Sequence, residues 1–161
     1  MPSGYVYERK VDFHETDAAG IVHFSNFFRY MEAAEHAFLR SLGLSVHPPY
    51  IPGQPRVGWP RVQATCDYLR PLRFEDTVQV RLLVHRIEPR CLDYLFGIHA
   101  LGQAEPSAIG QVIAVCVDLP EPGSGRAMRS RDLPAAFAGQ LEVAPEVERS
   151  ALLTLREKVR R

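Results

Sequence analysis

The most constraining feature of the chain is a single long amphipathic segment that is followed by short alternating runs. From Asn26 to Leu42 large apolar residues recur every three or four positions, which predicts a helix with one buried face. At about 1.5 Å per residue this helix is about 25 Å long. Ser25 or Asn26 is suited to cap its start, and Gly43 is suited to end it. The apolar stripe consists of Phe27, Met31, Ala34, Phe38 and Leu42.

Strand-like alternation precedes and follows this helix. Residues 5–13 alternate, with Tyr7, Val11 and Phe13 on one face. Four later runs have the same period, and the last is apolar on both faces, as in an interior strand. The short links EPR and GQAEPS suit antiparallel hairpins. The four runs are Val62–Tyr68, Val78–Val84, Leu92–Ile98 and Ile109–Leu119.

One helix and about five antiparallel strands predict an α+β fold, with the helix packed on one face of the sheet. Such a sheet leaves an edge strand and a second face, which favours self-association. The proline-rich segment, residues 46–60, is predicted to be a loop without regular structure. Residues 133–141 are expected to form a short helix. We expect one domain over residues 1–140, followed by a tail or short helix over 141–161.

Charge and cysteine content exclude several classes of protein. The 19 basic and 19 acidic residues cancel, so no net charge favours nucleic acid or an anionic membrane. No apolar run is long enough to insert into a bilayer, and no signal peptide is recognisable, so we expect a cytoplasmic protein. Cys66, Cys91 and Cys116 are odd in number and widely spaced, which predicts buried free thiols in a reducing compartment.

The segment DFHETDAAGIVHFSNFFRYMEAAEHAF, from Asp12 to Phe38, places a carboxylate and a glycine-containing turn directly before the helix. Backbone N–H groups at a helix start are unpaired and lie at the positive end of the dipole, so they can stabilise an oxyanion. A carboxylate beside them can act as a general base or a nucleophile. An Asp before a Gly turn is also a common turn residue. The residues alone therefore leave an ordinary turn and an active site both open.

The stretch from Val11 to Asp17, with the following AAGIVHFSNFFRYMEAAE, resembles the signature of hotdog-fold acyl-CoA thioesterases of the 4-hydroxybenzoyl-CoA thioesterase-like group. That group includes the thioesterases associated with the Tol–Pal cell-envelope system. The segment DYLRPLRFEDTVQV is similar to the strand–turn–strand at the edge of the family's acyl pocket. The resemblance implies a curved antiparallel sheet wrapped around the long helix. It also implies a homodimer or a dimer of dimers, with active sites at the subunit interface.

The same resemblance implies an acyl-CoA or aryl-CoA thioesterase that needs no cofactor. Asp17 matches the family's catalytic carboxylate, and Gly20 would let the turn approach the substrate carbonyl. The oxyanion donor maps to the backbone N–H of Phe24. His23 either contacts the substrate carbonyl, places Asp17, or is simply half-buried. Asn26 is most simply a helix cap, and it could also order the site.

Substrate-binding residues are harder to assign from the sequence. Arg86, Arg90 and Arg126 are candidates for binding the CoA phosphates, although a solubilising role is common for any single arginine. Trp59 and Tyr68 are candidates for lining the acyl pocket, although strand aromatics are commonly core residues. We expect the proline-rich segment to cover the pocket and to favour an aryl or medium-length acyl group.

Other assignments remain open. Glu35 is a reserve candidate for the base, because other hotdog thioesterases use a helix glutamate, but a solvent-facing or interface role is the alternative. His14, Glu15 and Thr16 are expected to form a solvated loop. The histidines lack the ligand spacing of a metal site, so we expect no metal.

Three further functions compete with acyl-CoA hydrolysis. A hotdog hydratase is disfavoured, because His23 follows Asp17 without the Asn-Pro context of those sites. A non-catalytic acyl-binding or scaffold protein would keep the pocket without needing Asp17. A thioesterase acting on acyl-carrier protein is the third alternative.

Overall fold

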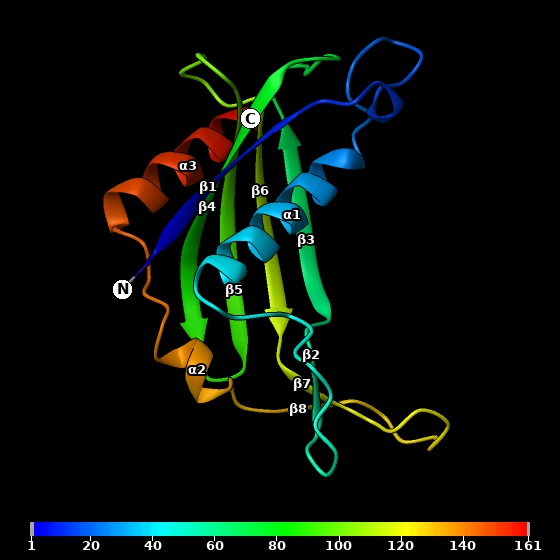
Figure 1. Ribbon diagram of the computed structural model, residues 1–161. Helices are drawn as coiled ribbons and strands as arrows, with labels where there is room; N and C mark the ends of the chain where they lie inside the picture. The colour runs from blue at the N-terminus through cyan, green and yellow to red at the C-terminus, as the bar shows by residue number, and fades with distance from the viewer. Residues whose placement is uncertain (1, 161) are drawn as a thin grey trace.

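The computed structural model describes residues 2–160. Its main sheet is antiparallel and five-stranded, in the order β1-β4-β5-β6-β3, and helix α1 lies across one face (Figure 1). The predicted combination of one long helix and an antiparallel sheet is confirmed. The elements are β1 Gly4–Lys10, the 3-10 turn η1 Phe13–Glu15, α1 Asn26–Ser41, β2 Arg56–Gly58, β3 Arg61–Tyr68, β4 Thr77–Glu88, β5 Cys91–Ala100, β6 Ala108–Val115, β7 Val117–Leu119, β8 Arg129–Ser130, α2 Ala135–Ala138 and α3 Glu146–Val159.

The main core fills the space between α1 and the sheet. Tyr30, Met31 and Phe38 of α1 are fully buried there. Gly110 on β6 permits the close approach of the helix, because a β-carbon built at this position would lie 2.1 Å from the sulfur of Met31. The helix therefore packs directly onto an interior strand of the sheet.

Helix α1 buries one charged residue that the apolar periodicity placed on its outer side. Glu35 is only 3% exposed, so a solvent-facing role is wrong. Its carboxylate accepts a hydrogen bond from Arg61 at 2.5 Å, and this ion pair offsets part of the cost of burial. At the end of the helix Gly43 has a φ of +71°, as predicted for the residue that follows the C-cap.

The strands follow the predicted order, with two corrections. The hairpins β4–β5 and β5–β6 are antiparallel, as the short links predicted. The run from 109 to 119 is broken at Cys116: β6 keeps the predicted interior position, whereas β7 pairs with β2. The first strand ends at Lys10 rather than Phe13. Phe13 lies exposed in η1, where the N–H of Glu15 bonds the carbonyl of Asp12 and turns the chain.

The proline-rich segment contains a strand, so the prediction that it lacks regular structure is wrong. Residues Arg56–Gly58 form β2, which pairs with β7, and β7 pairs with β8. This small sheet extends from the end of the main sheet at which β3 begins (Figure 1). The predicted helix over residues 133–141 is reduced to the four residues of α2.

The C-terminal segment is a helix rather than a loose tail. Helix α3 and the residues before it cover part of the sheet face opposite α1. Among residues 2–160, no helix combines the length and the apolar character that a membrane crossing requires. A second, smaller core forms under α3 from Leu83, Leu95, Ile109, Ala144 and Leu152.

Candidate active site

The turn before α1 is closed by short-range hydrogen bonds. An isolated bridge joins Thr16 to Val22, and the N–H of Asp17 donates to the carbonyl of Ile21 at 2.9 Å. The N–H of Gly20 donates to the carbonyl of Asp17, also at 2.9 Å. Gly20 has a φ of +72°, a conformation that side-chain-bearing residues rarely adopt. The turn therefore depends on glycine at this position.

Asp17 is exposed at the start of this turn. One of its carboxylate oxygens accepts the N–H of Ala19 at 2.8 Å, which is the geometry of an Asx turn. Within residues 2–160 its other oxygen has no hydrogen-bond partner. Asp17 therefore serves the turn and still presents a carboxylate oxygen to a ligand.

Phe24 lies two residues before α1, next to the N-cap residue Ser25. None of the hydrogen bonds among the described residues uses its N–H. Its carbonyl accepts a hydrogen bond of 3.0 Å from the Tyr68 hydroxyl. The segment that would supply an oxyanion donor is thus fixed to the end of β3.

His23 and Asn26 have local partners. The Nδ1 atom of His23 lies 2.8 Å from the hydroxyl of Ser25, and its ring packs against Phe24 with centroids 4.4 Å apart. Asn26 is not the helix cap, because the cap position is Ser25, whose side chain makes no capping bond. Instead, Asn26 is buried and its amide donates to the carbonyl of Glu15 at 2.8 Å.

A cavity of about 510 Å³ lies beside Asp17 and the start of α1. Its wall includes the aromatic rings of Phe27 and Tyr68, which meet edge to face with centroids 5.1 Å apart. Burial, together with neighbouring Cys66, raises the pKa of Tyr68 to about 12, so its hydroxyl remains a donor at neutral pH. The cavity is lined by Asp17, Ile21, Val22, Phe24, Phe27, Tyr68, Leu69, Arg70 and Pro71.

The other predicted substrate-binding residues lie away from this cavity within the chain. Arg86 pairs with the buried Asp93, and Arg90 pairs with Asp132. Arg126 lies in the exposed loop before β8, and Trp59 packs on Phe137 near α2. They lie toward the end of the sheet where β4 turns into β5, whereas Asp17 is near the opposite end, where β1 ends and β4 begins.

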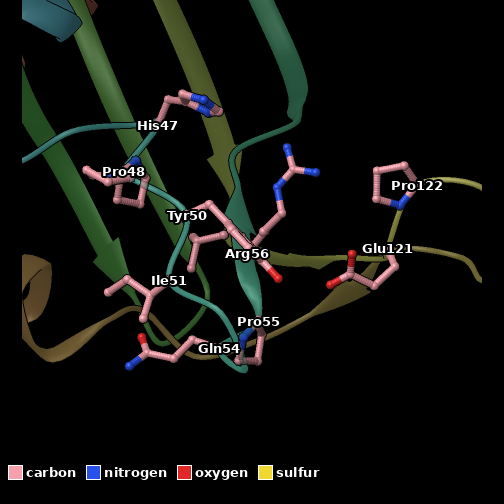
Figure 2. A pocket seen from close by; sticks show the side chains of 11 residues that line it. His47, Pro48, Tyr50, Ile51, Gln54, Pro55, Arg56, Glu121 and Pro122 are labelled. Carbon is pink, nitrogen blue, oxygen red and sulfur yellow. The ribbon is translucent and has the colours of Figure 1, made fainter.

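The proline-rich segment does not lie over the Asp17 cavity in this chain. It encloses its own cavity of about 440 Å³, together with Glu121 and Pro122 (Figure 2). Tyr50 and Arg56 line this second cavity (Figure 2). The expectation that this segment forms a lid therefore does not hold within one copy of the chain.

Glu35 lies apart from Asp17, in a third cavity of about 180 Å³ between α1 and β3. Burial raises the pKa of its carboxyl to about 7, and the Arg61 guanidinium opposes this shift. Tyr94 lies fully buried, and within the described chain its hydroxyl has no hydrogen-bond partner. Glu35 is thus a buried acid outside the Asp17 cavity.

Sequence reasoning missed two residues near the site. Arg70 lines the Asp17 cavity and forms an ion pair with Glu105. Its position after a strand carried no periodic signal. Glu15 was assigned to a solvated loop but is only 6% exposed. It lies with Asp12 and His14 in a group whose potential metal-ligating atoms are within 4.8 Å of one another, but its oxygens already accept protein donors.

Comparison with known proteins identifies the family of the chain. A family model described as the thioesterase-like superfamily matches residues 11–141. The chain belongs to this superfamily. A 1,4-dihydroxy-2-naphthoyl-CoA hydrolase from Synechococcus sp. (strain CC9902) is 32% identical over 123 residues, which cover 71% of this chain and 83% of the relative. The family resemblance inferred from the motif around Asp17 is therefore confirmed.

Solved structures confirm the hotdog fold of this superfamily member. A 1,4-dihydroxy-2-naphthoyl-CoA thioesterase from Synechocystis aligns with a TM-score of 0.70 and 25% identity, over 84% of this chain and 93% of that chain. A 4-hydroxybenzoyl CoA thioesterase shares the fold, with a TM-score of 0.72 and 16% identity over 86% of this chain and 98% of that chain. The first two curated relatives are matched over only 59% and 64% of their own lengths.

Proposed function

We propose that this protein hydrolyses acyl-CoA or aryl-CoA thioesters to a free acid and CoA. The observation that carries the proposal is the position of Asp17. Its unpartnered carboxylate oxygen lies at a largely apolar cavity that also contains Phe24, at the start of α1. A carboxylate and an unpaired backbone N–H just before a helix, both beside an acyl-sized cavity, are groups that thioester hydrolysis can use.

The reaction can be written with Asp17 as general base. The carboxylate removes a proton from water, and the resulting hydroxide attacks the thioester carbon. The N–H of Phe24 donates to the oxyanion that forms. The C–S bond then breaks, and the CoA thiolate takes the proton from Asp17. With Asp17 as nucleophile, attack on the thioester carbon would instead expel CoA thiolate and leave an anhydride for water to hydrolyse.

Aromatic acyl groups are the preferred substrates in this proposal. Phe24, Phe27 and Tyr68 line the cavity, and flat aromatic groups pack favourably against such rings. Relatives named as hydrolases of 1,4-dihydroxy-2-naphthoyl-CoA also support an aryl thioester. Arg70 is the cation placed to meet an anionic part of the substrate.

The proposed assembly is a homodimer that forms along the edge strand β3 in a reducing, cytoplasmic compartment. Val62, Gln63 and Ala64 are exposed on this edge. A two-fold axis perpendicular to the sheet makes paired edge strands antiparallel, so the Arg61 end of one copy lies beside the Tyr68 end of the other. In that arrangement the small sheet of one copy approaches the Asp17 cavity of its partner. The dimer would thereby bring the predicted substrate residues at one end of the sheet close to Tyr68 and the Asp17 cavity of the partner. The residues at that end are Trp59, Arg86, Arg90 and Arg126.

The test is thiol release from aryl-CoA, branched acyl-CoA and straight acyl-CoA thioesters. Wild-type protein should turn over at least one class, with aryl esters preferred. Asp17→Asn should lose at least ~100-fold in kcat, in line with the usual contribution of a positioned acid–base group. Retained binding of CoA thioesters by this variant would show that its site is intact. An inert wild type would end the proposal and direct attention to carrier-protein thioesters.

A further inference from the structure

Glu15 is a buried carboxylate two residues before Asp17 that the proposed reaction does not use. Its side chain accepts hydrogen bonds from the N–H of Asp12 at 2.8 Å and from the hydroxyl of Tyr30 at 2.9 Å. The guanidinium of Arg9 lies 2.7 Å from its other oxygen. A buried carboxylate is costly unless donors satisfy its oxygens, and here the donors are Arg9 of β1, Asp12 at the N-cap of η1 and Tyr30 of α1.

The main chain of Glu15 makes a second set of contacts. Its carbonyl accepts the N–H of His23 and the side-chain amide of Asn26, both at 2.8 Å. One residue therefore connects strand β1, the turn that contains Asp17 and the first residues of α1. No other residue of the turn has its side chain bonded to both β1 and α1 within residues 2–160.

The partners of Glu15 are themselves held in place. Arg9 stacks over the ring of Tyr30, with its guanidinium carbon 4.7 Å from the ring centroid. Burial, followed by the hydrogen bond to Glu15, raises the pKa of Tyr30 above its ordinary value, so the hydroxyl stays protonated and donates. Arg9, Glu15 and Tyr30 thus form a partly enclosed unit beside the site.

The structure assigns Glu15 as the positioning residue that fixes Asp17 relative to the N–H of Phe24. This assignment rests on the proposed thioesterase function. Asp17 follows Glu15 by two residues. Phe24 lies between His23 and Asn26, which both donate a hydrogen bond to the Glu15 carbonyl. Displacing Glu15 shifts Asp17 and the N–H of Phe24, while Phe27 and Tyr68 stay in place in the cavity wall.

The test compares Glu15→Gln with Glu8→Gln, a matched change of an exposed glutamate on the same strand as Arg9. We expect Glu15→Gln to lower kcat by ~10-fold or more with KM changed by less than ~2-fold, because small misplacements of reacting groups are costly. Glu8→Gln should behave as wild type. Tyr30→Phe, which removes only the hydroxyl, should lower kcat in the same direction by a smaller factor.

Binding stoichiometry separates misplacement from partial unfolding. Calorimetric titration of the Glu15→Gln/Asp17→Asn double variant with a CoA thioester measures the fraction of molecules that bind. If the double variant binds with the same stoichiometry as Asp17→Asn, the result supports positioning. If its binding fraction is instead reduced by the same factor as the kcat of Glu15→Gln, Glu15 only stabilises the fold and the assignment is overturned.

Two further outcomes would also overturn it. One is a folded Glu15→Gln with kcat within ~2-fold of wild type. If Glu15→Gln does not fold, Tyr30→Phe decides, and unchanged kcat in that variant contradicts the assignment. Loss of activity in Asp17→Asn with an active Glu15→Gln would leave the proposed function standing and remove only this inference. An inert wild type would remove both.

Discussion

The guanidinium of Arg156 on α3 donates a hydrogen bond of 2.8 Å to the carboxylate of Asp67 on β3, across 89 positions of sequence. The same guanidinium donates to Gln111 at 2.7 Å and to Thr65 at 2.6 Å. These bonds, together with the smaller core under α3, attach the C-terminal helix to the two strands at one side of the sheet. Burial acts to raise the pKa of Asp67, but hydrogen bonds from Arg160 and Arg156 outweigh it and hold the pKa below its ordinary value.

Removing this guanidinium should destabilise the fold. We expect Arg156→Ala to lower the free energy of unfolding by about 3 kcal/mol, because it removes a buried charged donor, leaves the side-chain oxygen of Gln111 without its donor, and leaves Asp67 paired only with the exposed Arg160. Urea denaturation measures the change. Arg160→Ala is the control, since Arg160 bonds the same carboxylate from an exposed position and should have little effect. Equal losses in both variants would contradict a special role for Arg156.

Glu35 should make stability depend on pH. Burial raises the pKa of its carboxyl from the ordinary 4.5 to about 7, so the folded state holds the proton more tightly than the unfolded state. The stability from this group is therefore complete below pH 4.5 and is lost as pH rises through 7.

Urea unfolding at pH 5 and pH 8 tests this dependence. Glu35→Gln should remove a pH-dependent loss on the order of 2 kcal/mol from the wild-type curve. Glu32→Gln, at an exposed position on the same helix, removes only the smallest contribution to the raised pKa of Glu35, so it should keep most of the wild-type slope. The prediction is wrong if Glu35→Gln and wild type lose the same stability between the two pH values.

The contact between Gly110 and Met31 should not tolerate a methyl group. Gly110→Ala is expected to cost about 1–3 kcal/mol of stability, because the added carbon overlaps the Met31 sulfur in a filled core. A double-mutant cycle with Met31→Ala separates this clash from backbone effects. Met31→Ala should cost less in the Gly110→Ala background than in wild type, and simple additivity would exclude the clash as the cause.

The Tyr68 ring should discriminate between acyl groups. Tyr68→Ala removes one of the rings that line the cavity, together with its contact with Phe27. An aryl group would lose this ring as a packing partner, so we expect KM for an aryl-CoA to rise by ~5–10-fold, in line with the energy of an aromatic pair. Acetyl-CoA should show little change. Tyr68→Phe keeps the ring and removes only the hydroxyl that bonds the Phe24 carbonyl, so its KM for aryl-CoA should stay near wild type. Equal KM changes for aryl and acetyl substrates would contradict an aryl-binding wall.

Periodicity predicted the elements that bury one complete face. Helix α1 and the hairpins β4–β5 and β5–β6 follow the expected pattern because their alternation matches the layer they pack against. The turn at Gly20 and the helix end at Gly43 were also predictable, because glycine is the residue type favoured where the backbone needs a positive φ. Both glycines have a positive φ in the structure. The motif around Asp17 carried the family resemblance.

What periodicity missed depends on partners distant in sequence. Glu35 looks like a surface residue until Arg61 is brought beside it, and Glu15 does so until Tyr30 of α1 donates to it. The strand β2 exists only because β7 pairs with it. The placement of Arg86 and Arg90 away from Asp17 follows from the antiparallel pairing of β1 with β4, which no local pattern reveals.

The smaller core under α3 has a consequence for synthesis of the chain. Leu83, Leu95 and Ile109 are made well before Ala144 and Leu152, which cover them. While the protein is being translated, the main core can close around α1, but these three side chains remain open to water and to neighbouring nascent chains. Several ribosomes translate one messenger RNA at the same time. Each nascent chain therefore exposes an aggregation-prone apolar sheet face until residues 144–156 have been synthesised.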